Sequence, residues 1–167
     1  MKLKNLFESG EDERSAQFAE MQKRMENLPL TGDPTKDGML QFLAMHHYPL
    51  DNTKWVDVAP CTPEIRAHEK RVRMKECFNN CWHLCSMIPG AKYVLGYTAS
   101  FIPIEHAWIK IGETYYDPTL ELLHNRTGDA YLVYLELSMK ELIKYTTKNA
   151  NCPPALWDMY RMGYFKK

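Results

Sequence analysis

The stretch HAWIKIGETYYDPT, residues 106–119, has the pattern of a β-hairpin. β-Branched and aromatic residues favour strands, and Gly112-Glu113 supplies the residues of a tight turn between them. With the turn there, His106 lies opposite Thr119, and Asp117 shares a sheet face with His106. Diagonal neighbours on one face have Cα atoms about 7–8 Å apart, so an aspartate can reach an imidazole. The hairpin therefore predicts a His–Asp pair, as a general base and its orienting carboxylate require.

The segments outside this hairpin divide into helices and further strands. Helical patterns cover residues 12–28, 36–46, 139–147 and 154–165. Strand patterns cover residues 92–101, 102–111 and 130–137, while 114–122 is expected to be extended and 48–62 to be a long loop. Helices that precede and follow an antiparallel sheet predict an α+β architecture.

The chain length of 167 residues suits one compact domain with a substantial core. Within it we expect a helical part and loop over 1–62, a helix and sheet over 63–137, and helices over 138–167. Lys plus Arg and Asp plus Glu both total 21. The zero net charge gives no reason to expect a nucleic acid or an anionic membrane as partner.

The five cysteines are expected to be reduced thiols. Their number is odd, and the N-terminal sequence MKLKNLFESGEDERS lacks an apolar core of signal-peptide length. The sequence contains no run of about 18 apolar residues, so no transmembrane helix is predicted. We therefore expect a cytoplasmic protein that does not enter a membrane.

The segment CFNNCWHLC, residues 77–85, repeats cysteine at the spacing of one helix face. Cys77 and Cys85 would lie about 12 Å apart along the axis, too far for both to bind one zinc ion at about 2.3 Å. Disulfides between adjacent helical turns have poor geometry. Cys81 and Cys85 belong to an apolar stripe with Leu84 and are predicted to be buried. We expect neither a metal nor a cofactor.

Cys77 can be the reactive member of this group. A helix is predicted to begin at Thr62-Pro63-Glu64, and nothing up to Met87 forces a break, so the start of the cysteine helix stays open. A thiolate is stabilised at a helix N-terminus beside an imidazolium, and Cys77 is the cysteine of the segment nearest to such a start. Cys77, His106 and Asp117, in that chain order, form a candidate nucleophilic triad.

Four segments of the chain resemble the transglutaminase-like and papain-like thiol enzyme superfamily. They are ECFNNCWHLC around Cys77, VLGY at 94–97, HAW at 106–108 and DPT at 117–119. The resemblance implies an α+β papain-like core, in which the helix that begins with the nucleophile packs on an antiparallel sheet. It also implies that Cys77 is the nucleophile, His106 the base and Asp117 the residue that orients the base.

The activity that the resemblance implies is cleavage of a peptide, isopeptide or other amide bond in a protein or peptide substrate. A transamidase on the same triad and a catalytically silent protein-binding module of the same fold are alternatives. A metal-binding structural domain is a third, which the helix spacing disfavours. We expect substrate contacts from four further side chains, Trp108, Tyr97, Asn80 and Trp55.

Overall fold

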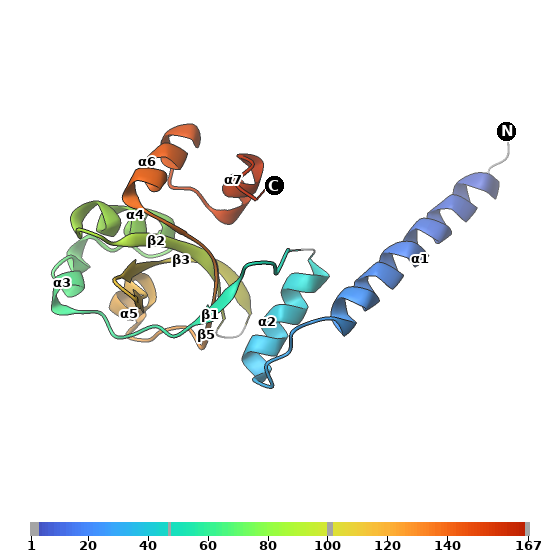
Figure 1. Ribbon diagram of the computed structural model, residues 1–167, viewed down its shortest axis with the longest axis horizontal. Coiled ribbons are helices and arrows are strands. Elements are labelled where there is room, and N and C mark those ends of the chain that lie inside the picture. The colour runs from blue at the N-terminus through green and yellow to red at the C-terminus, as the bar shows by residue number, and fades with distance from the viewer. Residues whose placement is uncertain (1–3, 47, 100–101, 166–167) are drawn as a thin grey trace. The chain divides into compact units, whose positions relative to one another are not determined.

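The structure of the protein, a computed structural model, describes residues 4–46, 48–99 and 102–165, with only the backbone for 4–14 (Figure 1). The chain divides into two compact units, residues 1–51 and 52–167. Whether the whole chain folds as one domain stays a prediction. No helix in the described part of the chain is long and apolar enough to cross a membrane.

The first unit consists of two helices that the sequence predicts. They are α1 (Lys4–Glu26) and α2 (Pro34–Met45), each of which begins earlier than predicted. α2 begins where the Asp33 side chain accepts hydrogen bonds from the backbone N–H groups of Thr35 and Lys36. Pro34 occupies the first helical position, where its missing N–H costs no hydrogen bond.

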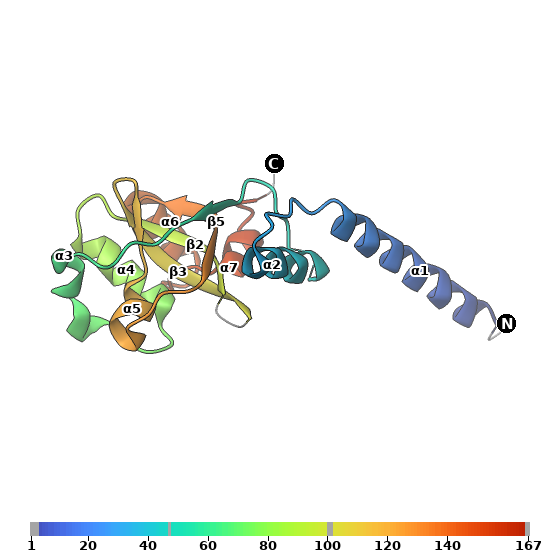
Figure 2. The same ribbon diagram turned by 90° about the horizontal axis from the view of Figure 1, so that it is seen from below.

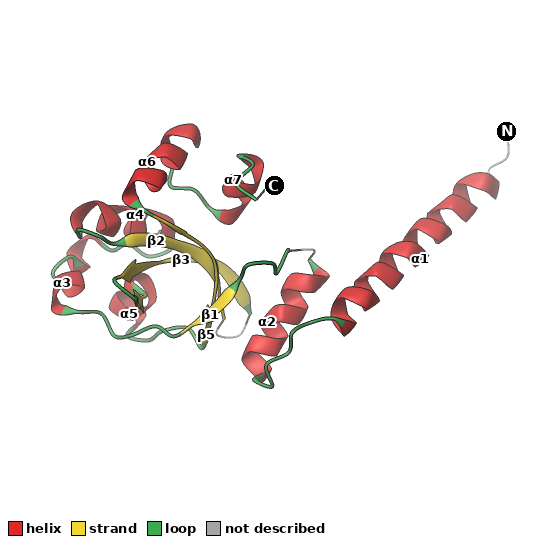
Figure 3. Ribbon diagram, in the orientation of Figure 1, coloured by secondary structure: helices red, strands yellow, loops and turns green. Residues whose placement is uncertain are grey.

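The second unit is built on a five-stranded sheet in which all paired strands are antiparallel (Figure 3). The strands are β1 (Lys54–Val56), β2 (Lys92–Ala99), β3 (Pro103–Ile111), β4 (Thr114–Tyr116) and β5 (Ala130–Leu137). Their order is β1-β5-β2-β3-β4. Just after β1, Val58 forms a parallel bridge with Tyr115 of β4, at the opposite edge. The sheet therefore curls until its two edges meet.

The inner face of this curled sheet is an apolar core. Its buried cluster takes one or two side chains from each of four strands: Val94, Trp108, Tyr115, Tyr131 and Val133. Two partly buried valines, Val56 of β1 and Val58 just after it, pack against this cluster. Burial of each such side chain contributes about 1.5–3 kcal/mol to the free energy of unfolding. The core thus stabilises the curl that brings distant strands together.

Helices lie on both sides of the sheet (Figure 1). Figure 1 shows α4 (Cys77–Met87) and α6 (Met139–Lys148) above β2, and α5 (Pro118–His124) below β3. The Cys81 thiol of α4 donates to the carbonyl oxygen of Ala107 in β3 at 3.2 Å. α5 also contacts α4, beside which it lies in the view from below (Figure 2). The predicted α+β architecture is confirmed.

Several predicted boundaries are wrong. The loop predicted over 48–62 contains β1, and the stretch 114–122 is extended only as far as Tyr116, because Pro118 begins α5. The helix predicted over 154–165 is the shorter α7 (Leu156–Arg161). The predicted strand ends at residues 100–101 lie outside the described residues.

The helix start predicted at Thr62 is confirmed, since its hydroxyl accepts a hydrogen bond from the backbone of Ile65. That helix, α3 (Pro63–Arg66), lasts only four residues. A 3-10 turn, η1 (Glu69–Arg71), follows it, and α4 begins separately at Cys77. The segment 62–87 therefore holds two helices and a turn rather than one continuous helix.

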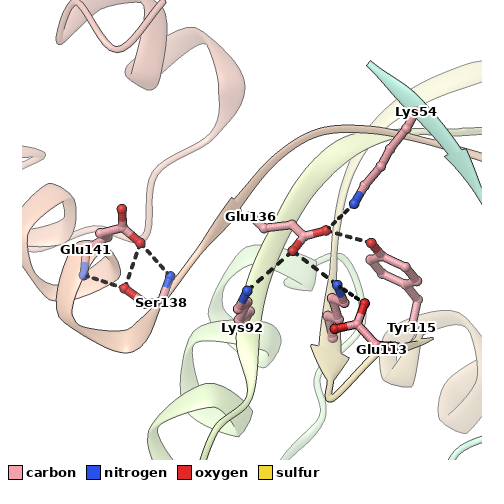
Figure 4. A network of polar contacts seen from close by, with 8 residues as sticks. Lys54, Lys92, Glu113, Tyr115, Glu136, Ser138 and Glu141 are labelled. Atoms are coloured by element: carbon pink, nitrogen blue, oxygen red, sulfur yellow. Dashed lines mark hydrogen bonds and ion pairs between the residues drawn. The ribbon is translucent and has the colours of Figure 1, made fainter. Parts of the chain in front are cut away.

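A charged network closes one end of the curled sheet (Figure 4). The Glu136 carboxylate of β5 accepts hydrogen bonds from Lys54 at 2.7 Å and from the Tyr115 hydroxyl at 2.6 Å. Lys92 and Lys110 lie 3.7 and 3.5 Å from its other oxygen. Burial raises the pKa of Glu136, but these hydrogen bonds and charges outweigh burial and lower it to about 2. One carboxylate therefore links all five strands.

Candidate active site

Cys77 is the first residue of α4, and a break in the helical backbone conformation just before it fixes this position. Lys75 adopts a left-handed conformation, with φ of 62°, which a continuous helix cannot contain. Asn80 holds the chain on the other side of the break, because its side chain accepts from Arg73 N at 2.9 Å and donates to Arg73 O at 2.7 Å. The thiol of Cys77 is half-buried at the helix N-terminus.

His106 lies on the inner face of β3, opposite Gly96 of β2. β4 pairs only with the last three residues of β3, so β3 has no strand beside His106 on that edge. A Cβ on Gly96 would lie 2.0 Å from Leu132 O and 2.7 Å from the Trp108 ring. Glycine thus leaves room for the indole of Trp108, which stacks on His106 with ring centroids 6.2 Å apart.

Asp117 is fully buried and uses both carboxylate oxygens. Its Oδ1 accepts from Leu120 N at 3.0 Å, as the N-cap of α5. Its Oδ2 lies 2.8 Å from His106 Nε2 and accepts from the Tyr131 hydroxyl at 2.8 Å. An ionised Asp117 accepts from Nε2–H, which leaves the other ring nitrogen, Nδ1, for a second partner.

The His–Asp contact is present, but the predicted hairpin register holds only near the turn. Ile111 does pair with Thr114, as a turn at Gly112-Glu113 requires. Pairing ends at Tyr116, however, so Thr119 lies in α5 and does not face His106 across a strand. Asp117 reaches the imidazole as a helix cap, and a diagonal strand position does not explain the contact.

The charge of His106 follows from this environment. Burial lowers the pKa of the imidazole, but the charge and hydrogen bond of Asp117, with a side-chain hydrogen bond to Cys77, outweigh burial and raise it to about 10. At neutral pH His106 is therefore an imidazolium between a buried carboxylate and a thiol. An imidazolium beside a cysteine is a common feature of sites that use a thiolate nucleophile.

The other cysteines of the core are held as thiols. Burial raises the pKa of the Cys81 thiol and raises that of Cys85 to about 12. Burial and the neighbouring Glu121 carboxylate also raise the pKa of Cys61. Cys81 and Cys85 are buried, as the apolar stripe predicts. Cys152 is exposed, and all five cysteines are free.

The remaining predicted site residues divide into two groups. Trp108 lies beside the His–Asp pair, and Asn80 touches Thr119 of α5 at 3.2 Å while it fixes the start of α4. Tyr97 packs on Tyr134 with ring centroids 5.7 Å apart, and its strand position places it on the outer face of the sheet. Trp55 also belongs to the outer face. Tyr97 and Trp55 therefore lie on the opposite face of the sheet from His106.

Tyr131 is a member of the site that the sequence did not indicate. Its hydroxyl accepts from Gly128 N at 2.7 Å while it donates to Asp117, and its ring meets Trp108 edge-on at 5.2 Å. In the sequence it is one aromatic residue in the strand run AYLVYLEL, residues 130–137. Only the curl of the sheet, which no local pattern encodes, brings β5 to Asp117.

Comparisons with known proteins identify no family for this chain. No family model matches the chain, and no curated protein or solved structure matches it. Within the described residues, no group of three or more His, Cys, Asp or Glu side chains is arranged to hold a metal ion.

Proposed function

We propose that this protein is a thiol enzyme that cleaves a peptide, isopeptide or other amide bond, with Cys77 as nucleophile and His106 as base. One observation carries the proposal: a single imidazole interacts with a thiol at a helix N-terminus and with a buried carboxylate that accepts two further hydrogen bonds. This is the arrangement that the resemblance to transglutaminase-like and papain-like enzymes implies. A purely structural cysteine does not require an imidazolium beside it.

In the proposed reaction, Nδ1 of His106 holds the proton of Cys77, and the thiolate attacks the substrate carbonyl carbon. The new C–S bond forms while the carbonyl π electrons move to oxygen. The first helical hydrogen bond runs from Asn80 N to Glu76 O, so the N–H groups of the first turn lie outside the helical ladder. Those N–H groups can stabilise the oxyanion.

Collapse of this intermediate breaks the C–N bond as the imidazolium protonates the leaving amine. The product is a thioester on Cys77 and a neutral His106. Water then attacks the thioester, with His106 as base, and the free acid and the thiol are restored. An amine in place of water would give transamidation, which is the alternative on the same residues.

Thiol labelling tests the proposal without knowledge of the substrate. At about pH 6, iodoacetamide should alkylate Cys77 at least about tenfold faster than Cys152, because only Cys77 lies beside an imidazolium. The Cys77→Ala variant should lose this fast phase, and Cys152→Ala, which removes the exposed thiol, should keep it. Equal and slow labelling of both thiols would reject the enzyme and favour a binding module of the same fold.

A further inference from the structure

A cationic pocket adjoins the start of α4. It has a volume of about 290 Å³, and its wall consists of Lys70, Arg71, Arg73, Glu76, Asn80 and His83. Three of these side chains are cations and one is a carboxylate. Within the described residues, the three cations make no ion pair, whereas Lys54, Arg66 and Lys110 each contact a carboxylate. The pocket therefore presents positive charge that the protein itself leaves unneutralised.

The pocket lies next to the nucleophile. Glu76, the N-cap of α4, directly precedes Cys77, and Asn80 follows Glu76 by one helical turn. Consecutive helical residues are separated by about 1.5 Å along the axis and about 100° around it. The thiol and the pocket thus occupy adjacent faces of one helix end, within the reach of neighbouring groups on one substrate.

The pocket wall is preorganised by a buried side chain. Asn80 is 3% exposed, and its amide fixes both backbone groups of Arg73 while it also donates to Thr119. Thr119 belongs to α5, whose cap is Asp117. Arg73 is therefore carried by backbone that is tied to the same two helices as the triad. Charged residues that were merely exposed to solvent would not need such an anchor.

We infer that this pocket is a substrate subsite that binds an anionic side chain next to the scissile amide bond. The inference rests on the proposed function, and it names the substrate class as acidic peptides. The group that such a substrate would place in the pocket is a carboxylate or a phosphate, which arginine binds through paired N–H donors. The whole chain has zero net charge, so the positive charge is confined to this pocket and an extended polyanion does not suit it.

Peptidyl chloromethyl ketones provide the probe, because thiolate attack forms a C–S bond and releases chloride, which intact mass reports. Five probes differ only in the residue next to the ketone: Asp, Glu, phosphoserine, Asn or Gln. The anionic probes should alkylate Cys77 about tenfold faster than the amide probes, which corresponds to about 1.4 kcal/mol. Comparison of the Asp and Glu probes with phosphoserine identifies carboxylate or phosphate as the preferred group.

Matched variants locate the effect. The double variant R71Q/R73Q should remove the preference for anionic probes, and K140Q/K148Q, which loses two exposed charges from α6, should keep it. The readout in each variant is the ratio of the anionic-probe rate to the amide-probe rate, because loss of two neighbouring cations also changes the reactivity of the thiol itself. A preference that is absent, or that survives in R71Q/R73Q, overturns the subsite while fast iodoacetamide labelling still supports the enzyme. If the unmodified protein shows no fast iodoacetamide labelling of Cys77, both the proposed enzyme and the proposed subsite are rejected.

Discussion

The Tyr131 hydroxyl and His106 Nε2 meet at the same oxygen of Asp117, each at 2.8 Å. The carboxylate is therefore held from three sides, since its other oxygen caps α5. The hydroxyl of Tyr131 bonds to Gly128 and Asp117, so it acts on the imidazole through Asp117 as a positioning residue. β5 is thereby coupled to the chemistry that we propose for α4 and β3.

Replacement of Tyr131 by Phe should slow Cys77 without abolishing its reactivity. A hydrogen bond to a charged group contributes about 1.5–3 kcal/mol, and the free energy of unfolding should fall by that amount in urea. The iodoacetamide rate should fall less than in His106→Ala, which removes the imidazole itself. Tyr134→Phe makes the same change on the outward side of β5 and should retain the labelling rate. If Tyr131→Phe labels Cys77 as fast as the unmodified protein does, Tyr131 has no positioning role.

The raised pKa of His106 predicts a pH-dependent contribution to stability. The pKa rises from the ordinary 6.5 in the unfolded chain to about 10 in the folded protein. Because the folded state binds the proton more tightly, this contribution is fully present below pH 6.5 and is lost as pH rises toward 10. The difference in free energy of unfolding between the unmodified protein and His106→Gln should therefore shrink across that window. A constant difference would contradict the imidazolium assignment.

Asn80→Ala should disrupt the start of α4. The change removes the hydrogen bonds to the backbone of Arg73, whose N–H and carbonyl lose their partner. We expect a loss of about 1–3 kcal/mol in the free energy of unfolding and slower alkylation of Cys77. Asn79→Ala is the matched control, since Asn79 is the exposed neighbour on the same helix. Equal effects of the two substitutions would show that Asn80 does not fix the break.

The sequence predicts those features of the site that depend on local pattern. The turn at Gly112-Glu113, the strand 130–137 and the burial of Cys81 all follow from residue types and spacing. The left-handed backbone of Lys75 was not predictable, because lysine carries no preference for it and a distant amide stabilises the break. The separation of α3 from α4 could therefore not be predicted.

The same limit explains the assignments of Asp117 and the aromatic residues. Sequence spacing predicts that Asp117 reaches His106, but it cannot distinguish a strand position from a helix cap. Proline at 118 is compatible with both, and the choice depends on Tyr131 and Leu120, which hold the carboxylate in place. Strand alternation separates the two faces of β2 but does not indicate which face lies inside the curl, so the outward position of Tyr97 cannot be predicted from sequence.

Gly96→Ala should destabilise the protein more than an ordinary core substitution. The added Cβ would lie 2.0 Å from a backbone oxygen, that of Leu132, which cannot move without displacing β5. Overpacking in a core costs about 1–3 kcal/mol, and a clash with backbone should reach the upper end of that range or exceed it. Because Trp108 would also have to shift, Cys77 in the protein that still folds should be alkylated more slowly.

Gly38→Ala is the control, since Gly38 is exposed in α2 and its Cβ would meet no atom within 4 Å. Alanine favours helix over glycine by about 0.5–1 kcal/mol, so Gly38→Ala should raise the unfolding midpoint. A Gly96→Ala protein that is as stable as the unmodified one would show that β2 and β5 can separate without cost at Gly96, where the register of their pairing shifts.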